Sequence, residues 1–285
     1  MAEQPISTNA AQIEFWNSPA SRAWADQHER MDRALAELTQ SLLGFAAAQP
    51  GERVLDIGCG GGTTVLELAA RVGSGGHVLG ADVAEHSVAR ARERIATAGL
   101  RQAEVVHADA STHPFPAASF DLAFSRLGVM FFSDPTAAFG NVRRAMRPGA
   151  RIALGVFRSA ESPFPSAPTE AVRHLLPPIP TPGPEEPGPF SWADPARVHR
   201  ILEGAGFREV SLTPLDPMIR LAGPGGAAEA ANFALLFGPL TRVLPSLSAE
   251  QRDVVRSTLE AFFRGYDGPQ GVALPAANWV VQARA

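Results

Sequence analysis

The sequence predicts an α/β fold built on a doubly wound, mostly parallel sheet of seven strands. Three observations support this class. Short apolar runs alternate with amphipathic stretches of ten or more residues. A glycine-rich loop follows the first of these apolar runs. The composition, 45% hydrophobic and 19% charged over 285 residues, is that of a globular chain. Such alternation is typical of βαβ units, whose parallel sheet is covered by helices on both faces.

The first half of the chain contains most of this alternation. Apolar side chains recur at helical spacing over residues 19–48, which predicts a helix broken once near Met31 and stopped at Gln49-Pro50-Gly51. We expect strands at 54–57, 77–81, 104–107, 120–125 and 151–157. The predicted helices between them are 63–72, 85–98 and 135–146.

The regularity fails after residue 157. Residues 158–190 contain at least ten prolines and allow one helix, 169–176, which indicates a lid. A helix capped by Asp194 should end near Gly204, and a strand follows at 207–215. Helices at 227–237 and 249–264 and a last strand at 278–283 complete the chain. This divides the chain into an N-terminal helical cap (1–50), a core (51–157), a proline-rich lid (158–190), and a segment (191–285) that completes the sheet around a helical insertion at about 217–273.

The composition excludes several classes of protein. All 25 basic residues are arginine, so a Schiff-base or phosphate-loop lysine is excluded. The net charge of −4 disfavours nucleic acid as a partner. A single cysteine permits no intramolecular disulfide and no cysteine-rich zinc site, and no metal is expected. We expect neither a membrane span nor a secretory signal, and hence a cytoplasmic protein, while a homodimer stays open.

The strongest motif is the run 54–63, VLDIGCGGGT, at the first strand-to-helix junction. Its glycines let the backbone approach a ligand closely, and the next helix presents free N–H groups. Asp82 ends the second strand, where a carboxylate can accept two ribose hydroxyls. Asp109 follows the third strand, within reach of a base. The pattern therefore predicts a nucleotide-type cofactor at the carboxyl ends of the strands.

Two cofactors compete for this layout. A dinucleotide site normally has a third glycine where this chain has Thr63. Asp56, two residues before the glycines, would repel a pyrophosphate but suits the ammonium group of a methionine moiety. Asp56 therefore favours S-adenosylmethionine over a nicotinamide cofactor.

With these motifs in order, the chain resembles the class I S-adenosylmethionine-dependent methyltransferases, which have a Rossmann-like fold. The nearest branch is the small-molecule one that includes the ubiquinone and menaquinone methyltransferases. The resemblance covers 51–157 well and is weak in 158–190 and 216–275. It is carried by 54–63, by Gly80-Ala81-Asp82-Val83, by His107-Ala108-Asp109-Ala110, by 120–135 and by Arg147-Pro148-Gly149.

The resemblance implies a role for each matched position. Gly58, Gly60 and Gly62 would approach the methionine part of the cofactor, whose amino group Asp56 would help to hold. Asp82 would take the ribose hydroxyls with Val83 beside the adenine, and Asp109 and Ala110 would contact the adenine. Cys59 would pack as a small residue of the loop. The other matched residues, expected to line the methionine end, are Ser125 and Arg126.

The acceptor site is less defined by sequence. Apolar and aromatic residues dominate the segments outside the sheet, so we expect a small, largely apolar acceptor bound by Trp16, Trp24, Phe131 and Phe164. In-line transfer of a methyl group from a sulfonium needs positioning and a dry site more than acid–base help. If the acceptor is a hydroxyl, a base is useful. The candidates are His28, His174 and Tyr266.

The leading hypothesis is thus a small-molecule methyltransferase that converts S-adenosylmethionine to S-adenosylhomocysteine. A nicotinamide-dependent oxidoreductase is one alternative. The other is a regulator that binds the cofactor without catalysis, which the absence of a clear base leaves open.

Overall fold

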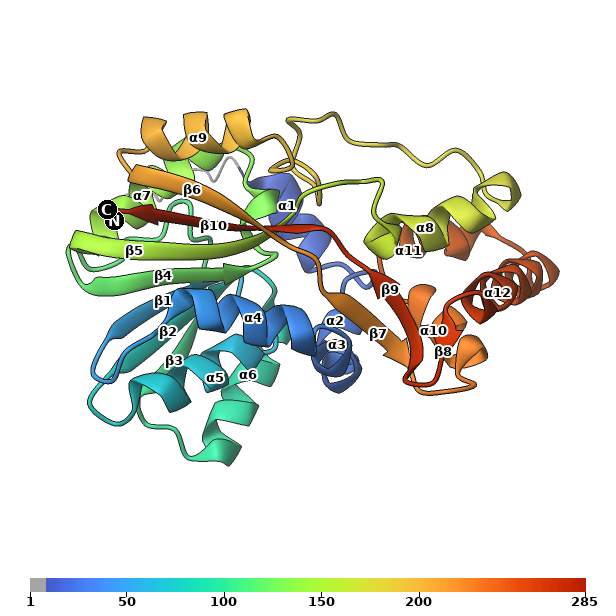
Figure 1. Ribbon diagram of the computed structural model, residues 1–285, viewed down its shortest axis with the longest axis horizontal. Coiled ribbons are helices and arrows are strands. Elements are labelled where there is room, and N and C mark those ends of the chain that lie inside the picture. Colours follow the sequence, from blue (N-terminus) through green and yellow to red (C-terminus); the bar gives the residue numbers. More distant parts are fainter. Residues whose placement is uncertain (1–8) are drawn as a thin grey trace.

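The computed structural model describes residues 9–285 and contains the predicted seven-stranded sheet (Figure 1). The strand order is β3-β2-β1-β4-β5-β10-β6. Strands β1 to β5 pair in parallel, and β10 pairs antiparallel with both β5 and β6. The order reverses between β1 and β4, the position at which doubly wound sheets bind ligands. The predicted fold class is confirmed.

Six strands of the large sheet lie within one residue of the predicted apolar runs at each end, whereas β5 begins five residues before its predicted start. The bounds of the seven strands are β1 (Arg53–Ile57), β2 (His77–Asp82), β3 (Ala103–His107), β4 (Phe120–Arg126), β5 (Met146–Phe157), β6 (Arg208–Leu215) and β10 (Asn278–Arg284). Strands β1 and β2 are buried along almost their whole length, as expected of central strands covered on both faces.

Helices cover both faces of this sheet (Figure 1). One face carries α4 (Ala36–Ala46), α5 (Thr63–Val72) and α6 (Glu85–Ala98), and the opposite face carries α7 (Pro135–Ala145) and α9 (Pro195–Gly204). Each face has its own apolar core, one around Leu42, Leu68 and Val88 and the other around Phe139 and Trp192. The side chain of Asp194 caps α9 as predicted, since it accepts the N–H groups of Ala196 and Arg197.

The N-terminal helices differ from the prediction of one helix with a break near Met31. The chain instead forms α1 (Ala10–Trp16), α2 (Ala23–Asp26), α3 (His28–Ala34) and α4. The breaks lie at Gln27 and Leu35, and Met31 is buried inside α3. Trp24, Met31 and Leu38, which lie on either side of the breaks, all pack into a third apolar cluster, the cap core, together with Phe233 and Phe263. The helical spacing in the sequence therefore hides the breaks.

The predicted helical insertion at 217–273 needs correction, because it begins and ends with strands. A second, antiparallel sheet joins β7 (Met218–Ala222), β9 (Gly271–Pro275) and the short β8 (Asp267–Gly268). In β7, buried Ile219 and Leu221 flank exposed Arg220, a period-two pattern too short to stand out in the sequence. The helices between these strands are α10 (Ala227–Ala234), α11 (Leu240–Val243), a single 3-10 turn η3 (Leu244–Ser246) and α12 (Ala249–Arg264).

The proline-rich segment contains more helix than predicted. Helix α8 (Pro163–Val172) starts six residues before the predicted helix, and the 3-10 turn η2 (Arg173–Leu175) follows it. The backbone of Phe164 is not helical, so the regular helix runs from Pro165, where a proline lacks only an N–H group that would have no helical partner; Pro168 lies inside the helix. Helix α8 packs on α12 and β9. None of the helices in residues 9–285 is long and apolar enough to cross a membrane.

Candidate functional site

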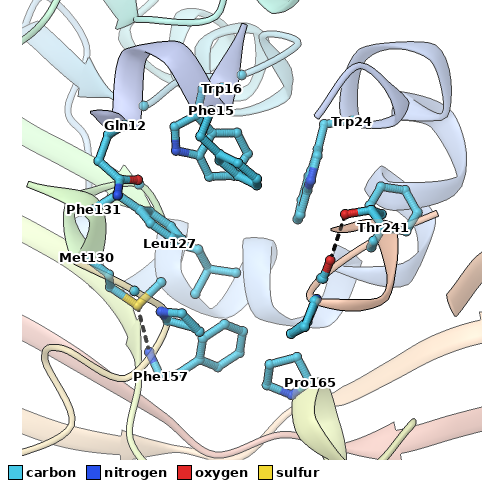
Figure 2. A pocket seen from close by; sticks show the side chains of 18 of the residues that line it. Gln12, Phe15, Trp16, Trp24, Leu127, Met130, Phe131, Phe157, Pro165 and Thr241 are labelled. Carbon is cyan, nitrogen blue, oxygen red and sulfur yellow. Dashed lines mark hydrogen bonds between the residues drawn. The ribbon is translucent and has the colours of Figure 1, made fainter. Parts of the chain in front are cut away.

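A cavity of about 680 Å³ lies at the carboxyl ends of β1, β2 and β4. Its remaining walls come mainly from the N-terminal helices, from α8 and residues 179–191, and from α10 and α11. Figure 2 shows Phe15, Trp16 and Trp24 projecting into the cavity from one side, with Phe157 and Pro165 opposite. The cavity therefore extends from the glycine-rich loop to three segments outside the sheet, namely the N-terminal helices, residues 158–190 and the helices that follow β7.

The glycine-rich loop needs its glycines for two separate reasons. Gly58, Gly60 and Gly62 have positive φ angles of 68°, 53° and 85°, a region that side chains disfavour. The loop is also tightly packed. A Cβ on Gly58 would lie 2.9 Å from the Cα of Gly128, and one on Gly62 would lie 2.9 Å from the Cβ of Ala91. Gly58 and Gly60 line the cavity, whereas Gly62 lies outside it as the residue before α5.

Asp82 is at the end of β2 and faces the loop. Its Oδ2 accepts the N–H of Gly60 and its Oδ1 accepts the N–H of Ala84, each at 2.8 Å. Burial raises the pKa of this carboxyl group, and the two backbone N–H groups oppose that shift. An ionised carboxylate has about four acceptor positions, so Asp82 can accept two further hydrogen bonds from a ligand. Val83 lines the cavity beside it.

Asp109 and Ala110 line the cavity after β3. The Oδ1 of Asp109 accepts the N–H of Ser111 at 2.9 Å and an N–H of the Asn9 side chain at 3.4 Å. Asn9 immediately precedes α1, and its own Oδ1 accepts the N–H of Ser133 at 2.8 Å. The start of α1 is thereby attached to two loops at the carboxyl edge of the sheet.

Asp56 lies beneath the loop, where its charge interacts with that of Arg126, a residue that lines the cavity. Asp56 is fully buried and does not line the cavity. Its Oδ2 accepts the hydroxyl of Thr64 at 2.5 Å, and its Oδ1 has no hydrogen-bond partner within residues 9–285. Burial raises the pKa of Asp56 to about 7, although Thr64 and the charge of Arg126 oppose the shift. Burial also lowers the pKa of Arg126, which donates to the hydroxyl of Thr39 at 2.7 Å.

Asp56 should make the stability of the unliganded protein depend on pH. Its pKa is about 7 in the folded state against an ordinary value of 3.8, so the folded state holds this proton more tightly. Stability therefore falls as the pH rises from about 4 to about 7. We expect Asp56→Asn to exceed the wild type by about 1–2 kcal/mol at pH 5 and by at most about 4 kcal/mol at pH 8, because the unfolded carboxyl is already ionised at pH 5. Urea unfolding at the two pH values measures this, with exposed Asp253→Asn as the control. A variant no more stable than the wild type at pH 8 would contradict the assignment.

Ser125 and Leu127 shape the turn after β4. Ser125 is buried and does not line the cavity, because its hydroxyl donates to the carbonyl of Ile57 at 2.7 Å and accepts the N–H of Gly128. Leu127 has a positive φ of 65°, which costs a side-chain-bearing residue about 1–3 kcal/mol. Its N–H donates to the carbonyl of Gly155 at 2.9 Å, and its side chain projects into the cavity (Figure 2).

Two contacts that the sequence did not reveal attach the N-terminal helices to the loop region. At the end of α1, the Asn17 side chain donates to the carbonyl of Val83 at 2.8 Å and accepts the N–H of Glu85 at 2.9 Å. In α3, Asp32 accepts hydrogen bonds from Thr63 and from Arg94, the latter at 3.0 Å. Arg94 also donates to the carbonyl of Gly61 at 2.8 Å. It therefore points toward the loop, although the arginines of such a helix would be expected to face solvent.

The four predicted acceptor residues all line the cavity. Trp16 packs edge-on against Trp24 and Phe131, with ring centroids 6.1 and 5.1 Å apart. Phe164 packs against Phe157 from the opposite wall. Aromatic side chains from the N-terminal helices, η1 (Val129–Phe131) and α8 thus meet around one space.

The three candidate bases are not equivalent. His28 lines the cavity above the loop, and its Nδ1 lies 3.1 Å from the carbonyl oxygen of Ala25. A carbonyl can only accept, so this contact requires the hydrogen on Nδ1 and leaves the lone pair on Nε2. His174 is exposed in η2 and Tyr266 packs on Phe262 in the cap core, and neither lines the cavity. Of the three predicted bases, only His28 therefore lies at the cavity wall. The turn after α8 directs His174 outward, and the apolar face of α12 retains Tyr266.

Metal ligands are not clustered in the described part of the chain. Residues 9–285 contain no group of three His, Cys, Asp or Glu side chains that could hold a metal ion. Cys59 is buried in the loop, and burial raises the pKa of its thiol.

Comparisons with known proteins identify relatives of this chain. Residues 54–149 match the family model described as a methyltransferase domain. The chain is 36% identical over 173 residues to aklanonic acid methyltransferase DauC of Streptomyces sp. (strain C5). The aligned region covers 55% of this chain and 75% of that protein. The chain is 33% identical over 141 residues to 27-O-demethylrifamycin SV methyltransferase of Amycolatopsis mediterranei, covering 49% of this chain. That second match spans only about half of the relative, at 51%.

Solved structures agree on the fold. Phosphoethanolamine N-methyltransferase 2 of Haemonchus contortus, solved with S-adenosyl-L-methionine, superposes with a TM-score of 0.60 over 98% of this chain and 60% of that one. The sequence identity is only 16%, so this similarity concerns the architecture alone.

Proposed function

The chain belongs to the S-adenosylmethionine-dependent methyltransferase family, and from that premise we propose that it methylates a small, largely apolar organic acceptor. One observation carries the proposal. The cavity that begins at the glycine-rich loop continues into a space lined by Trp16, Trp24, Phe131 and Phe164. An enclosed space with aromatic walls and few polar groups is typical of sites for small organic ligands.

The residues of the loop fit the family's cofactor. Gly58 and Gly60 hold the loop along the cavity in a left-handed backbone conformation, and two acceptor positions of Asp82 suit the hydroxyls of a ribose. We propose that Val83, Asp109 and Ala110 hold the adenine and that segment 51–157 provides most of the cofactor site. Because Asp56 lies beneath the cavity wall, we propose that it acts on the methionine end through Thr64 and the charge of Arg126.

When bound, S-adenosylmethionine supplies a methyl group activated by a positively charged sulfur. The protein has three tasks in this scheme. The aromatic residues exclude water and orient the acceptor, which contributes on the order of 7–11 kcal/mol in favourable cases. Leu127 forms part of the wall that the acceptor meets. For a hydroxyl acceptor, Nε2 of His28 takes up the proton that leaves the oxygen.

Incubating the protein with labelled S-adenosylmethionine and a native organic extract tests the proposal. We expect label in a small organic product together with stoichiometric S-adenosylhomocysteine. Thermal-shift measurements should show stabilisation by S-adenosylhomocysteine and none by NAD or NADP, which separates methyl transfer from hydride transfer. Label found only in tRNA or protein, or stabilisation by NAD alone, would refute the proposal. We further propose a cytoplasmic location and no nucleic-acid partner, while a homodimer stays a prediction.

A further inference from the structure

Three arginines of the described chain stack on aromatic rings. Arg30 lies 4.5 Å from the ring centroid of Phe233, Arg158 lies 5.3 Å from that of Trp279, and Arg242 lies 4.6 Å from that of Phe15. Two of these cations have a carboxylate partner. Arg30 pairs with Glu229 at 3.3 Å, and Arg158 pairs with Asp216. Within residues 9–285, Arg242 has no carboxylate partner.

Arg242 differs from the other two in its location as well. It belongs to α11 and lines the cavity together with its neighbour Thr241, whose side chain is labelled in Figure 2. Its side chain is exposed, so it borders the opening of the cavity and not its interior. Stacking uses the face of a guanidinium and leaves the N–H groups at its edge free to bind a planar anion.

The other arginines that line the cavity, Arg126 and Arg173, lie near carboxylates. Asp32 pairs with Arg94, Arg173 pairs with Glu170, and Glu186 accepts the N–H of Gly183 at 2.9 Å. Arg126 lies near the buried carboxylate of Asp56. Arg242 is thus a positive charge held in place by Phe15 but not neutralised, and Phe15 in turn packs on Trp16 of the aromatic cavity wall.

We propose that Arg242 binds a carboxylate group of the acceptor, whose apolar body lies among the aromatic residues of the cavity. This inference rests on the proposed function, since it names the acceptor class for the same cavity. The acceptor is then an amphipathic aromatic acid, oriented with its carboxylate at the opening. Stacking on Phe15 restrains the guanidinium in advance, which lowers the entropy cost of binding.

The test compares two probes of the same shape, naphthoate and naphthamide, which differ in charge. Their binding to the complex with S-adenosylhomocysteine is measured by isothermal titration calorimetry. We expect Arg242→Gln to weaken naphthoate about five- to tenfold and to leave naphthamide within about twofold. Arg30→Gln, which removes a stacked but paired arginine outside the cavity wall, should leave both probes unchanged. Arg242→Lys should retain part of the preference for naphthoate, because the charge remains.

Each result distinguishes this inference from the proposed function. Failure of the wild type to bind S-adenosylhomocysteine would refute the proposed function. Normal S-adenosylhomocysteine binding by Arg242→Gln, with naphthoate affinity unchanged, would overturn the carboxylate site alone. Equal losses for naphthoate and naphthamide, or the same loss in Arg30→Gln, would also overturn it, because the effect would then not depend on the charge at Arg242.

Discussion

Methyl transfer to a hydroxyl acceptor is expected to slow by a factor of about 100 to 10,000 in the His28→Ala variant. His28 lines the cavity, and its contact with the carbonyl of Ala25 leaves Nε2 as the proton acceptor. Without that acceptor the hydroxyl proton must pass to water, which the aromatic walls keep out. Single-turnover rates with saturating cofactor, measured on the acceptor fraction identified with labelled donor, give the effect directly.

His174→Ala and Tyr266→Phe are the matched controls for this prediction. Both residues are plausible bases by sequence, and both lie away from the cavity wall. They should transfer the methyl group at the wild-type rate, and all three variants should keep their affinity for S-adenosylhomocysteine. A normal rate for His28→Ala with a hydroxyl acceptor, or a large loss in either control, would show that the proton leaves by another route.

The affinity for S-adenosylhomocysteine should fall about 100-fold or more in Asp82→Ala, because two charge-assisted hydrogen bonds to the ribose are lost. The same carboxylate accepts the N–H groups of Gly60 and Ala84, so part of the loss reflects a less ordered loop. Calorimetric titration measures the affinity, and thermal melting of the unliganded protein measures the disorder.

Asp121→Ala provides the comparison for Asp82→Ala. Asp121 is also a strand carboxylate that accepts a backbone N–H, that of Arg53, but it lies at the opposite edge of the sheet and pairs with Arg147. Its loss should lower stability without changing cofactor affinity. Similar affinities for Asp82→Ala and the wild type would remove Asp82 from the proposed site.

The sheet was predictable because each of its strands is a local signal. Central strands such as β1 and β2 are continuous apolar runs, and the helices between them have a clear apolar face. The second sheet was missed because β7, β8 and β9 have only two to five residues each, and because β7 finds its partner β9 across the long α10–α12 segment. Non-local pairing of short strands leaves little periodicity for the sequence to show.

The residues of the candidate site show the same difference between local and non-local signals. Gly58, Asp82 and Asp109 lie next to strand ends, so their positions follow from the fold. Asn9, Asn17 and Arg242 act through contacts with distant segments, and isolated polar residues carry no pattern that would single them out. His174 shows the opposite case. Its position within the predicted lid did not determine which way its side chain points.

The two asparagines of α1 have a kinetic consequence. Asn17 binds the backbone of residues 83 and 85 and Asn9 binds Asp109, so both ends of α1 are attached to groups that we assign to the adenosine. Exchange of spent cofactor for fresh then requires this helix to detach. We therefore expect ordered turnover, in which the methylated product departs first and the opening of α1, not the transfer itself, limits the steady-state rate.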